Sequence, residues 1–398
     1  MFFLNQIISY IFFNFGYLII TPKMYSFGGF YASILHGFRL ANQKNKKNIF
    51  AIPVINLSEK NFINIYHTDL TKKIFLNYSS FEKILCLIIS IYLNLNILVL
   101  LFLKKILFEK YNSKYIHLIF SDYIGYADRQ NKEFDFFLKE LNIDNNEIVK
   151  EKIDLSNLYN TYNSKSVCFC IKDNNYEKIK EISNFYTSDI NKCRKSLDYL
   201  MNKNFEVKRV GESLMNKFDF THKNYHDLCY EKNSNDLFNK TLAGCEFYFG
   251  SSSSMGNSPE IFNKKKFIIN EYDHLNFSLS EKINNFVIFK KFYCSKTNKI
   301  LKINELFEKK LFSFMDVNKG INDKIIYAKE NTESEIFEGL VEFYEFNYKN
   351  KKNNFLLNKK YLEMRDYYLN KFYYELNMVY YKNYTCTIPE SYLSKYLI

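Results

Sequence analysis

Tryptophan is absent from this 398-residue sequence, and arginine is scarce. Only five of the 55 basic residues are arginines, while Phe and Tyr together number 74 (40 + 34), which indicates a coding bias rather than selection for charge. A formal net charge of +12 is typical of proteins that contact nucleic acid or an anionic membrane. Because the basic residues are scattered and not grouped in blocks, we interpret the charge as lysine usage with some attraction to membrane surfaces.

Cysteine pairs with the CxxC spacing of zinc and redox motifs are also absent. Eight cysteines are present, and Cys86, Cys168, Cys170 and Cys245 lie inside apolar runs. This placement favours reduced thiols in the core of a cytoplasmic protein over disulfides or zinc ligands. We therefore expect no metal site. We also expect no bound cofactor.

Several motifs that mark known enzyme classes are missing. The sequence has no GxSxG nucleophile elbow, no GxxxxGK[ST] phosphate loop and no HExxH helix. It also lacks the combination of aromatic and basic residues that marks RNA-binding modules. These absences argue against the corresponding hydrolases, nucleotide triphosphatases, metalloproteases and RNA binders.

What the sequence does contain is an alternation of strand-like and helix-like segments. Apolar runs of strand length are followed by amphipathic segments, an order typical of α/β proteins with parallel sheets. Length and a hydrophobic content of 47% suit two domains. We predict an α/β fold with domains at residues 1–155 and 156–330 and further helices in 331–398. The predicted strands include 17–22, 48–54, 115–120, 166–171, 205–210, 247–249 and 267–269, and the predicted helices include 30–42, 58–67, 131–141, 188–202, 236–244, 334–347 and 359–376.

Residues 84–103 form an uncharged run long enough to cross a bilayer. Ser90, Asn94 and Asn96 interrupt it, and lysines flank both ends, so the positive-inside rule assigns no orientation. A helix that lies in the membrane interface, anchored by lysines to anionic lipid, fits this symmetry. A transmembrane helix and a helix buried between domains remain open as alternatives.

The most specific pattern is AGCEFYFGSSSSMGNSPEIFNKKKFIIN at residues 243–270. An apolar run ends in small residues, and a short helix and a second apolar run follow. Backbone N–H groups and hydroxyls at such a turn are free to face an anion, and ligands of open parallel sheets bind beside the carboxyl ends of strands. We predict a phosphate site formed by Gly250, Ser251, Ser252, Ser253, Ser254 and Gly256.

Cationic side chains follow two other predicted strands. Lys172 and Asp173 come directly after the strand at 166–171, and Arg209 lies near the end of the strand at 205–210. Together with the serine turn, these loops would converge at one edge of the sheet. This set suits a diphosphate, because Arg209 can hold two oxygens at once and Lys172 can act as a point charge.

Four further residues are candidates for the site. Glu260 could reach a ribose hydroxyl, although a solvent-facing helix residue fits equally well. Gly28 and Gly29 occupy the equivalent loop of the first domain, where glycine permits close approach of a ligand to the backbone or simply makes a tight turn. His36 follows that loop and is the candidate general base, with a structural histidine as the alternative.

These segments resemble the glycosyltransferases of bacterial surface-polysaccharide and O-antigen loci. The turn at 243–270 is similar to the family's strand, Gly-x-Ser-Ser-Gly-like turn and second strand ending in Asn. Four other segments look like further parts of that family, namely VCFCIKDNNY, FEVKRVGE, NTESEIFEGLVEFYE and IPESYLSKYL. The chain departs from the pattern at Lys172, where the family has Arg, at Asn263, where it has Gly, and at Lys265 or Lys266, where it has Pro.

The resemblance implies a GT-B-like architecture, in which two Rossmann-like domains face a cleft and the last helices pack back on the N-terminal domain. It further implies that the C-terminal domain binds a nucleotide-sugar donor and the N-terminal domain a glycan or lipid-linked acceptor. We expect a cytoplasmic glycosyltransferase, peripheral on the inner face of the cell membrane. The alternatives are an inactive GT-B-like protein that binds a nucleotide or glycan and a basic protein associated with nucleic acid.

Overall fold

The structure is a computed structural model that describes residues 11–12, 14–20, 27–50, 65–107, 152–161, 165–173, 187–211, 215–231, 234–252, 256, 258–274, 284–351, 355–372 and 386–397. The chain divides into two compact units between Tyr159 and Asn160, close to the boundary predicted between residues 155 and 156. Each unit is described by itself. The strand predicted at 115–120 and the helix predicted at 131–141 lie outside the described residues.

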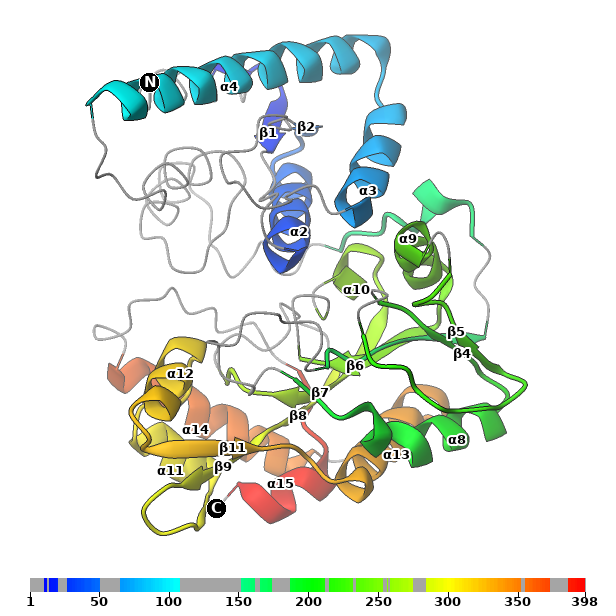
Figure 1. Cartoon of the computed structure of the whole chain (residues 1–398), viewed down its shortest axis with the longest axis vertical. Helices are drawn as coiled ribbons and strands as arrows, with labels where there is room; N and C mark the ends of the chain where they lie inside the picture. The colour runs from blue at the N-terminus through cyan, green and yellow to red at the C-terminus, as the bar shows by residue number, and fades with distance from the viewer. Residues whose placement is uncertain are drawn as a thin grey trace. The chain divides into compact units, whose positions relative to one another are not determined.

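The first unit begins with a β–α–β motif. Strands β1 (Tyr17–Ile20) and β2 (Lys47–Phe50) pair in parallel, and helix α2 (Phe27–Gln43) connects them (Figure 1). The predicted elements are therefore present at nearly the predicted places. One detail was wrong, because Gly28 and Gly29 lie in the first turn of α2 and not in a loop before it.

Further along this unit lie helices α3 (Ile65–Leu76) and α4 (Ser80–Leu107) and a short 3-10 helix, Ser156–Tyr159. The helix predicted at 58–67 falls within the described residues only from Ile65, and α3 extends beyond its predicted end to Leu76. A capping box starts α4, because the Ser79 hydroxyl accepts from the Glu82 amide and the Glu82 carboxylate accepts from Ser79. Residues 84–103 thus belong to one continuous helix. Within the described residues, no helix combines the length and the apolar character that crossing a bilayer requires.

The second unit, which begins at Asn160, is built on a six-stranded parallel sheet. Its strands are β3 (Ser166–Cys170), β4 (Glu206–Arg209), β5 (Tyr225–Asp227), β6 (Phe247–Ser251), β7 (Lys265–Glu271) and β8 (Phe286–Phe289). The spatial order is β5-β4-β3-β6-β7-β8, so the chain moves outward from β3 in one direction and outward from β6 in the other. This is the doubly wound order. The α/β class is confirmed, and the sheet is compatible with a Rossmann-like fold.

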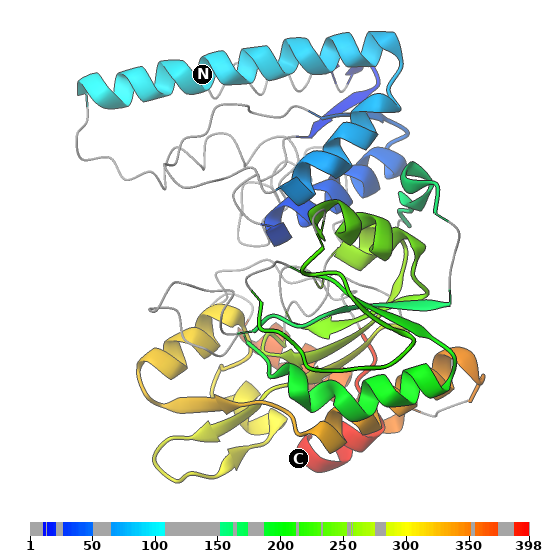
Figure 2. The ribbon, with the colours of Figure 1, turned by 45° about the vertical axis from the view of Figure 1, so that its right-hand side comes forward.

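Helices cover both faces of this sheet, which explains why its central strands are almost continuously apolar. Helices α8 (Arg194–Asn202) and α13 (Glu333–Tyr348) lie on one face, and α9 (Ser234–Gly244) and α10 (Ser258–Ile261) lie on the other (Figures 1 and 2). A short 3-10 helix, Ile190–Cys193, leads into α8. On the first face, the Phe343 ring packs 5.0 Å from Phe247 and 5.9 Å from Phe267, centroid to centroid.

The cysteines lie where the sequence predicts. All eight are free, and seven are buried. Burial raises the pKa of the Cys168 thiol in β3, so this side chain behaves as a small apolar group. Their role as core thiols is confirmed.

A small antiparallel sheet follows β8 and was not expected from the sequence. It consists of β9 (Lys291–Cys294), β10 (Ile300–Leu301) and β11 (Ile326–Lys329), with helices α11 (Ile303–Glu308) and α12 (Phe314–Asn322) beside it. Phe292, Leu306, Val317 and Ile326 form its own core. A strand of two residues and helices of six and nine residues give too short a periodic signal to be recognised from the sequence.

The two long closing helices are confirmed as α13 and α14 (Leu356–Phe372), and the tail forms α15 (Glu390–Tyr396). Thr332 and Glu335 make a capping box that fixes the start of α13. Helix α13 packs on β7 and β8, and α15 packs on α13 and α14, all within the second unit. That the last helices also pack on the N-terminal unit stays a prediction.

Gly250 in β6 has no room for a side chain, so we predict that Gly250→Ala strongly destabilises the second unit. A Cβ atom there would lie 2.5 Å from the Cys170 carbonyl oxygen and closer still to the Tyr248 hydroxyl. We expect a loss of about 2 kcal/mol or more in the free energy of unfolding, measured by denaturant titration. Gly256→Ala is the control, because its Cβ would lie 3.3 Å from the flexible end of Ile268. Equal stability of the two variants would contradict the prediction.

Candidate functional site

The strand order reverses between β3 and β6, and this is where a doubly wound sheet binds its ligands. Cys170 in β3 is the register partner of Gly250 in β6, so the residues after both strands lie side by side. The Lys172 amide donates to the Ser251 hydroxyl at 2.9 Å, and the Ser188 amide donates to the Lys172 carbonyl at 2.8 Å. The two strand ends and the chain that returns after β3 are thus tied together at one edge of the sheet.

A buried carboxyl group lies at the end of the next strand. Glu271 is the last residue of β7, and its Oε1 accepts from the amides of Tyr272 at 2.8 Å and Asp273 at 3.1 Å. The Ser252 hydroxyl also hydrogen-bonds this carboxyl group. Burial, followed by the nearby charge of Asp273, raises the pKa of Glu271 to about 7. Glu271 therefore changes its charge near neutral pH.

A buried lysine follows the outer strand β8. The Lys290 ammonium donates to the Thr187 carbonyl at 2.7 Å, and the Lys290 amide donates to the Glu271 carbonyl at 2.6 Å. Burial lowers the pKa of Lys290 to about 8. Perturbed groups of this kind gather at functional sites more often than elsewhere. Neither Glu271 nor Lys290 was predicted from the sequence, although each stands where an apolar run ends, which is the signal that marks a residue at the carboxyl edge.

Arg209 does reach the carboxyl edge, but its side chain is enclosed. The residue is fully buried at the end of β4 and forms an ion pair with Asp227 at 2.8 Å. Its second terminal nitrogen donates to the Asn216 carbonyl at 2.6 Å, and the Asn216 amide donates to Asp173 at 2.5 Å. Arg209 and Asp173 therefore hold the segment around Asn216 against the sheet, and the expected two-pronged grip of Arg209 on a diphosphate is not what these contacts provide.

Glu260 is likewise an internal residue rather than an open ribose ligand. It is buried in α10, pairs with buried Lys266 at 3.1 Å and accepts from the Asn285 side chain at 2.9 Å. Lys266 also donates to the Gly256 carbonyl at 3.1 Å. Glu260 therefore neither faces solvent nor is open to a ribose hydroxyl. It forms a buried ion pair that fixes α10 on β7.

The helix start predicted to bind phosphate is also weaker than expected. Helix α10 has only four residues, and Glu260 lies in its first turn. A helix of one turn aligns few peptide dipoles, so the positive potential at its N-terminus is small. The Glu260 carboxylate in that turn already neutralises part of this potential. Asn263 follows in the left-handed region, at φ 52°, a conformation that Asn adopts more readily than most side chains.

The remaining predicted residues are placed as follows. Gly250 and Ser251 belong to strand β6, and Ser252 directly follows it, whereas Ser253 and Ser254 lie outside the described residues. His36 lies in α2, and its side chain is outside the described part of the structure. Gly28 and Gly29 belong to the first unit. Lys172, Ser251 and Ser252 are therefore the predicted residues that the structure brings together at the edge.

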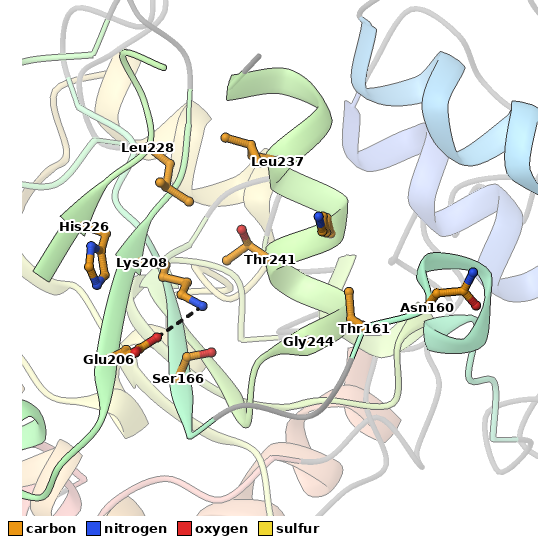
Figure 3. Close-up of a pocket in the computed structure, with 11 residues that line it drawn as sticks. Asn160, Thr161, Ser166, Glu206, Lys208, His226, Leu228, Leu237, Thr241 and Gly244 are labelled. Atoms are coloured by element: carbon orange, nitrogen blue, oxygen red, sulfur yellow. Dashed lines mark ion pairs between the residues drawn. The ribbon is translucent and has the colours of Figure 1, made fainter. Parts of the chain in front are cut away.

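A separate hollow of about 710 Å³ lies between α9 and the sheet, and includes the first residues of β3 and β4 (Figure 3). Lys208 pairs there with Glu206 at 3.3 Å, while Leu237 and Thr241 of α9 face the strands. Charges of both signs mix with hydroxyls and leucines along its wall. Its lining residues include none of the described residues predicted to bind the donor, so the hollow is distinct from the carboxyl edge.

Among the described residues, no three or more His, Cys, Asp or Glu side chains are grouped to hold a metal ion. Comparison with known proteins adds no assignment, because no family model, curated protein or solved structure matches the chain. The site is therefore characterised by its own geometry.

The buried pair Glu260–Lys266 predicts a strong coupling between two substitutions. Lys266→Met leaves a carboxylate buried without its cation, and we expect a loss of about 3–5 kcal/mol in the free energy of unfolding. Adding Glu260→Gln to that variant removes the uncompensated charge, so the double variant should be more stable than Lys266→Met alone. Denaturant unfolding of both singles and the double measures this coupling, and additive losses would show that the two side chains are independent.

Proposed function

We propose that the protein is a glycosyltransferase that uses a nucleotide-sugar donor, whose diphosphate binds at the carboxyl edge between β3 and β6. The observation that carries this proposal is the reversal of strand order at that edge, since open α/β sheets bind nucleotides there. Lys172 is partly exposed beside Ser251, and Ser252 is close by. These small and basic residues suit a ligand with phosphate oxygens.

The chemistry of sugar transfer fits the charges at this edge. The bond between the anomeric carbon and the donor diphosphate breaks, the oxygen of an acceptor hydroxyl forms the new bond to that carbon, and the hydroxyl proton passes to a base. Negative charge grows on the departing diphosphate, and the Lys172 ammonium group stabilises it. A carboxyl group with a pKa near 7, such as Glu271, is suited to exchange a proton at neutral pH.

The second unit binds the donor, and the first unit holds a glycan or lipid-linked acceptor in a GT-B-like arrangement of two domains. The protein works in the cytoplasm as a peripheral protein of the membrane, and needs no cofactor beyond its donor. The resemblance of the segment at 243–270 to glycosyltransferases of surface-polysaccharide loci supports this assignment.

A binding protein without turnover is the second candidate. The enclosed contacts of Arg209 and Glu260 favour it, because both residues direct their charges to partners inside the protein. Donor hydrolysis and sugar transfer, followed across a panel of nucleotide-sugars, separate the two. Turnover supports the transferase, and saturable binding of a nucleotide-sugar without turnover supports the binding protein.

Lys172→Ala should weaken donor binding about tenfold, because it removes one cation beside the diphosphate in a partly buried setting. Calorimetry with the nucleotide-sugar that raises the Tm most gives the affinity. Lys240→Ala is the matched control, since Lys240 lines the separate hollow. If both variants bind as the unmodified protein does, the diphosphate does not lie at the carboxyl edge.

Donor affinity should also fall as the pH rises through about 7, the pKa of Glu271. Below that pH the carboxyl group is neutral, and above it a carboxylate repels the diphosphate. The loss of charge on Lys290 near pH 8 acts in the same direction. A nucleotide-sugar is the right probe, because its diphosphate diester keeps its charge in this range.

The Glu271→Gln variant should bind the donor with unchanged affinity as the pH rises through 7, up to about pH 8, where Lys290 loses its charge. Protein stability needs its own control. The folded pKa of Glu271 lies above the unfolded one, so its stabilising contribution is full at acid pH and is lost as the pH rises through about 7. Affinities are therefore compared well below the Tm. An unchanged pH profile in Glu271→Gln would contradict a role for this carboxyl group.

A further inference from the structure

Helix α4 of the first unit exposes one continuous apolar face. Six large apolar side chains along it are between 54% and 59% exposed, namely Phe81, Ile84, Leu87, Ile88, Ile91 and Leu95. Their spacings of mostly three and four residues place them on one side of the helix. Leu76 at the end of α3 is also exposed, at 60%. We call these seven side chains the apolar face.

The opposite side of α4 is bound to the protein. Glu82, Cys86 and Ile89 are buried, and the latter two pack against Ile19 of β1 and Ile49 of β2. A surface helix normally shows charged residues to water and apolar residues to the core. Here aliphatic side chains occupy both sides. Because α4 packs on the β1–β2 pair, only one side of this part of the helix is exposed. It therefore does not present apolar side chains to lipid around its whole circumference.

The charges next to the apolar face have one sign. Between Lys72 and Leu95 the only acidic residue is Glu82, which is buried and paired with Lys47 at 3.0 Å. Lys72 is exposed and Lys83 is half-buried at the start of the face. The surface that α3 and α4 present is therefore apolar with basic residues at its margin.

We propose that the apolar face of α4 binds an anionic lipid bilayer, with the helix lying in the plane of the membrane. The apolar side chains enter the boundary between head groups and acyl chains, and Lys72 and Lys83 contact anionic head groups. This deepens the proposed peripheral membrane association and rests on that part of the proposed function, but not on the glycosyltransferase reaction.

A bilayer fits this face better than a second copy of the chain. From Phe81 to Leu95 the face spans about 20 Å at the rise of an α-helix, and none of its seven side chains carries a hydrogen-bonding group. Specific protein interfaces combine an apolar centre with about one hydrogen bond per 100–200 Å². Two copies in contact through this face would also bring basic margins together, whereas anionic lipid complements them.

The absence of tryptophan from the 398-residue chain gives a direct test. Ile91→Trp places a single fluorophore in the apolar face, and Leu356→Trp places one at a matched 59% exposure in α14. With vesicles of phosphatidylcholine and phosphatidylglycerol, we expect the Ile91→Trp variant to show a blue shift of its emission and quenching by brominated acyl chains. The control should show neither. Equal responses of the two variants, or no response of Ile91→Trp, would overturn the proposal.

Co-flotation with the same vesicles provides the second measurement. Ile88→Glu/Ile91→Glu should lower vesicle binding at least tenfold, while Leu356→Glu should leave it unchanged. Binding should also fall at least tenfold on vesicles of phosphatidylcholine alone or at high salt. Equal binding to neutral and anionic vesicles would overturn the role of the lysines.

Light scattering without lipid tests whether a second copy of the chain occupies the apolar face. A concentration-dependent dimer that Ile88→Glu/Ile91→Glu abolishes would assign the face to a second copy and overturn the proposal. A monomer that binds vesicles supports it. Nucleotide-sugar binding by the same variants should be unchanged. A protein that binds vesicles but no nucleotide would therefore contradict the donor site and leave the membrane face intact.

Discussion

All six strands of the central sheet run in the same direction, and the rest of the second unit depends on this constraint. Parallel neighbours need long crossovers, and helices α8, α9 and α10 lie in such crossovers, while α13, which follows the small sheet, adds to the cover of one face. The same constraint brings every strand's carboxyl end to one edge. Four residues from distant parts of the chain lie at that edge because each stands at the end of a strand of this sheet, namely Lys172, Ser251, Glu271 and Lys290. The strand order reverses among them, which leaves that point as the natural place for a ligand.

Buried charge decides which polar residues of the second unit face a ligand and which stabilise the fold. Removing a charged group from water is unfavourable unless a partner of opposite sign and further hydrogen bonds replace the lost hydration. Arg209 meets this requirement through Asp227 and Asn216, and Lys266 meets it through Glu260 and Gly256. These side-chain and backbone partners leave both cations structural. The candidate site consequently shifts toward Lys172, which follows β3 and is partly exposed. Glu271 and Lys290 at the ends of β7 and β8 are themselves buried and hydrogen-bonded within the protein, and the shifts in their pKa values, not exposure, mark them as candidates.

The first unit shows the opposite relation between apolar surface and water. In the six-stranded sheet the apolar faces are covered by helices, whereas α4 keeps a row of apolar side chains exposed after its other side has packed on β1 and β2. Exposed apolar rows of this kind mark surfaces that bind lipid or protein. A helix that binds the bilayer would keep the protein at the membrane, where a lipid-linked acceptor of the proposed reaction is found.

Local pattern in the sequence was sufficient to predict the α/β alternation, the strands β1, β3, β4, β6 and β7, the long helices and the core cysteines, because these depend on periodicity and burial of neighbouring residues. The small sheet β9–β11 escaped prediction, since its elements are too short to carry a period. The side-chain partners could not be predicted from the sequence. Arg209 and Asp227 are 18 residues apart, and Glu260 and Asn285 are 25 apart. Only the packed sheet brings these side chains into contact. The sequence by itself therefore determined that Lys172, Arg209 and the serines after Gly250 stand at strand ends, but not Glu271 or Lys290. The tertiary structure decided which of them are enclosed in the fold and which lie where a ligand can bind, because that depends on partners that folding supplies.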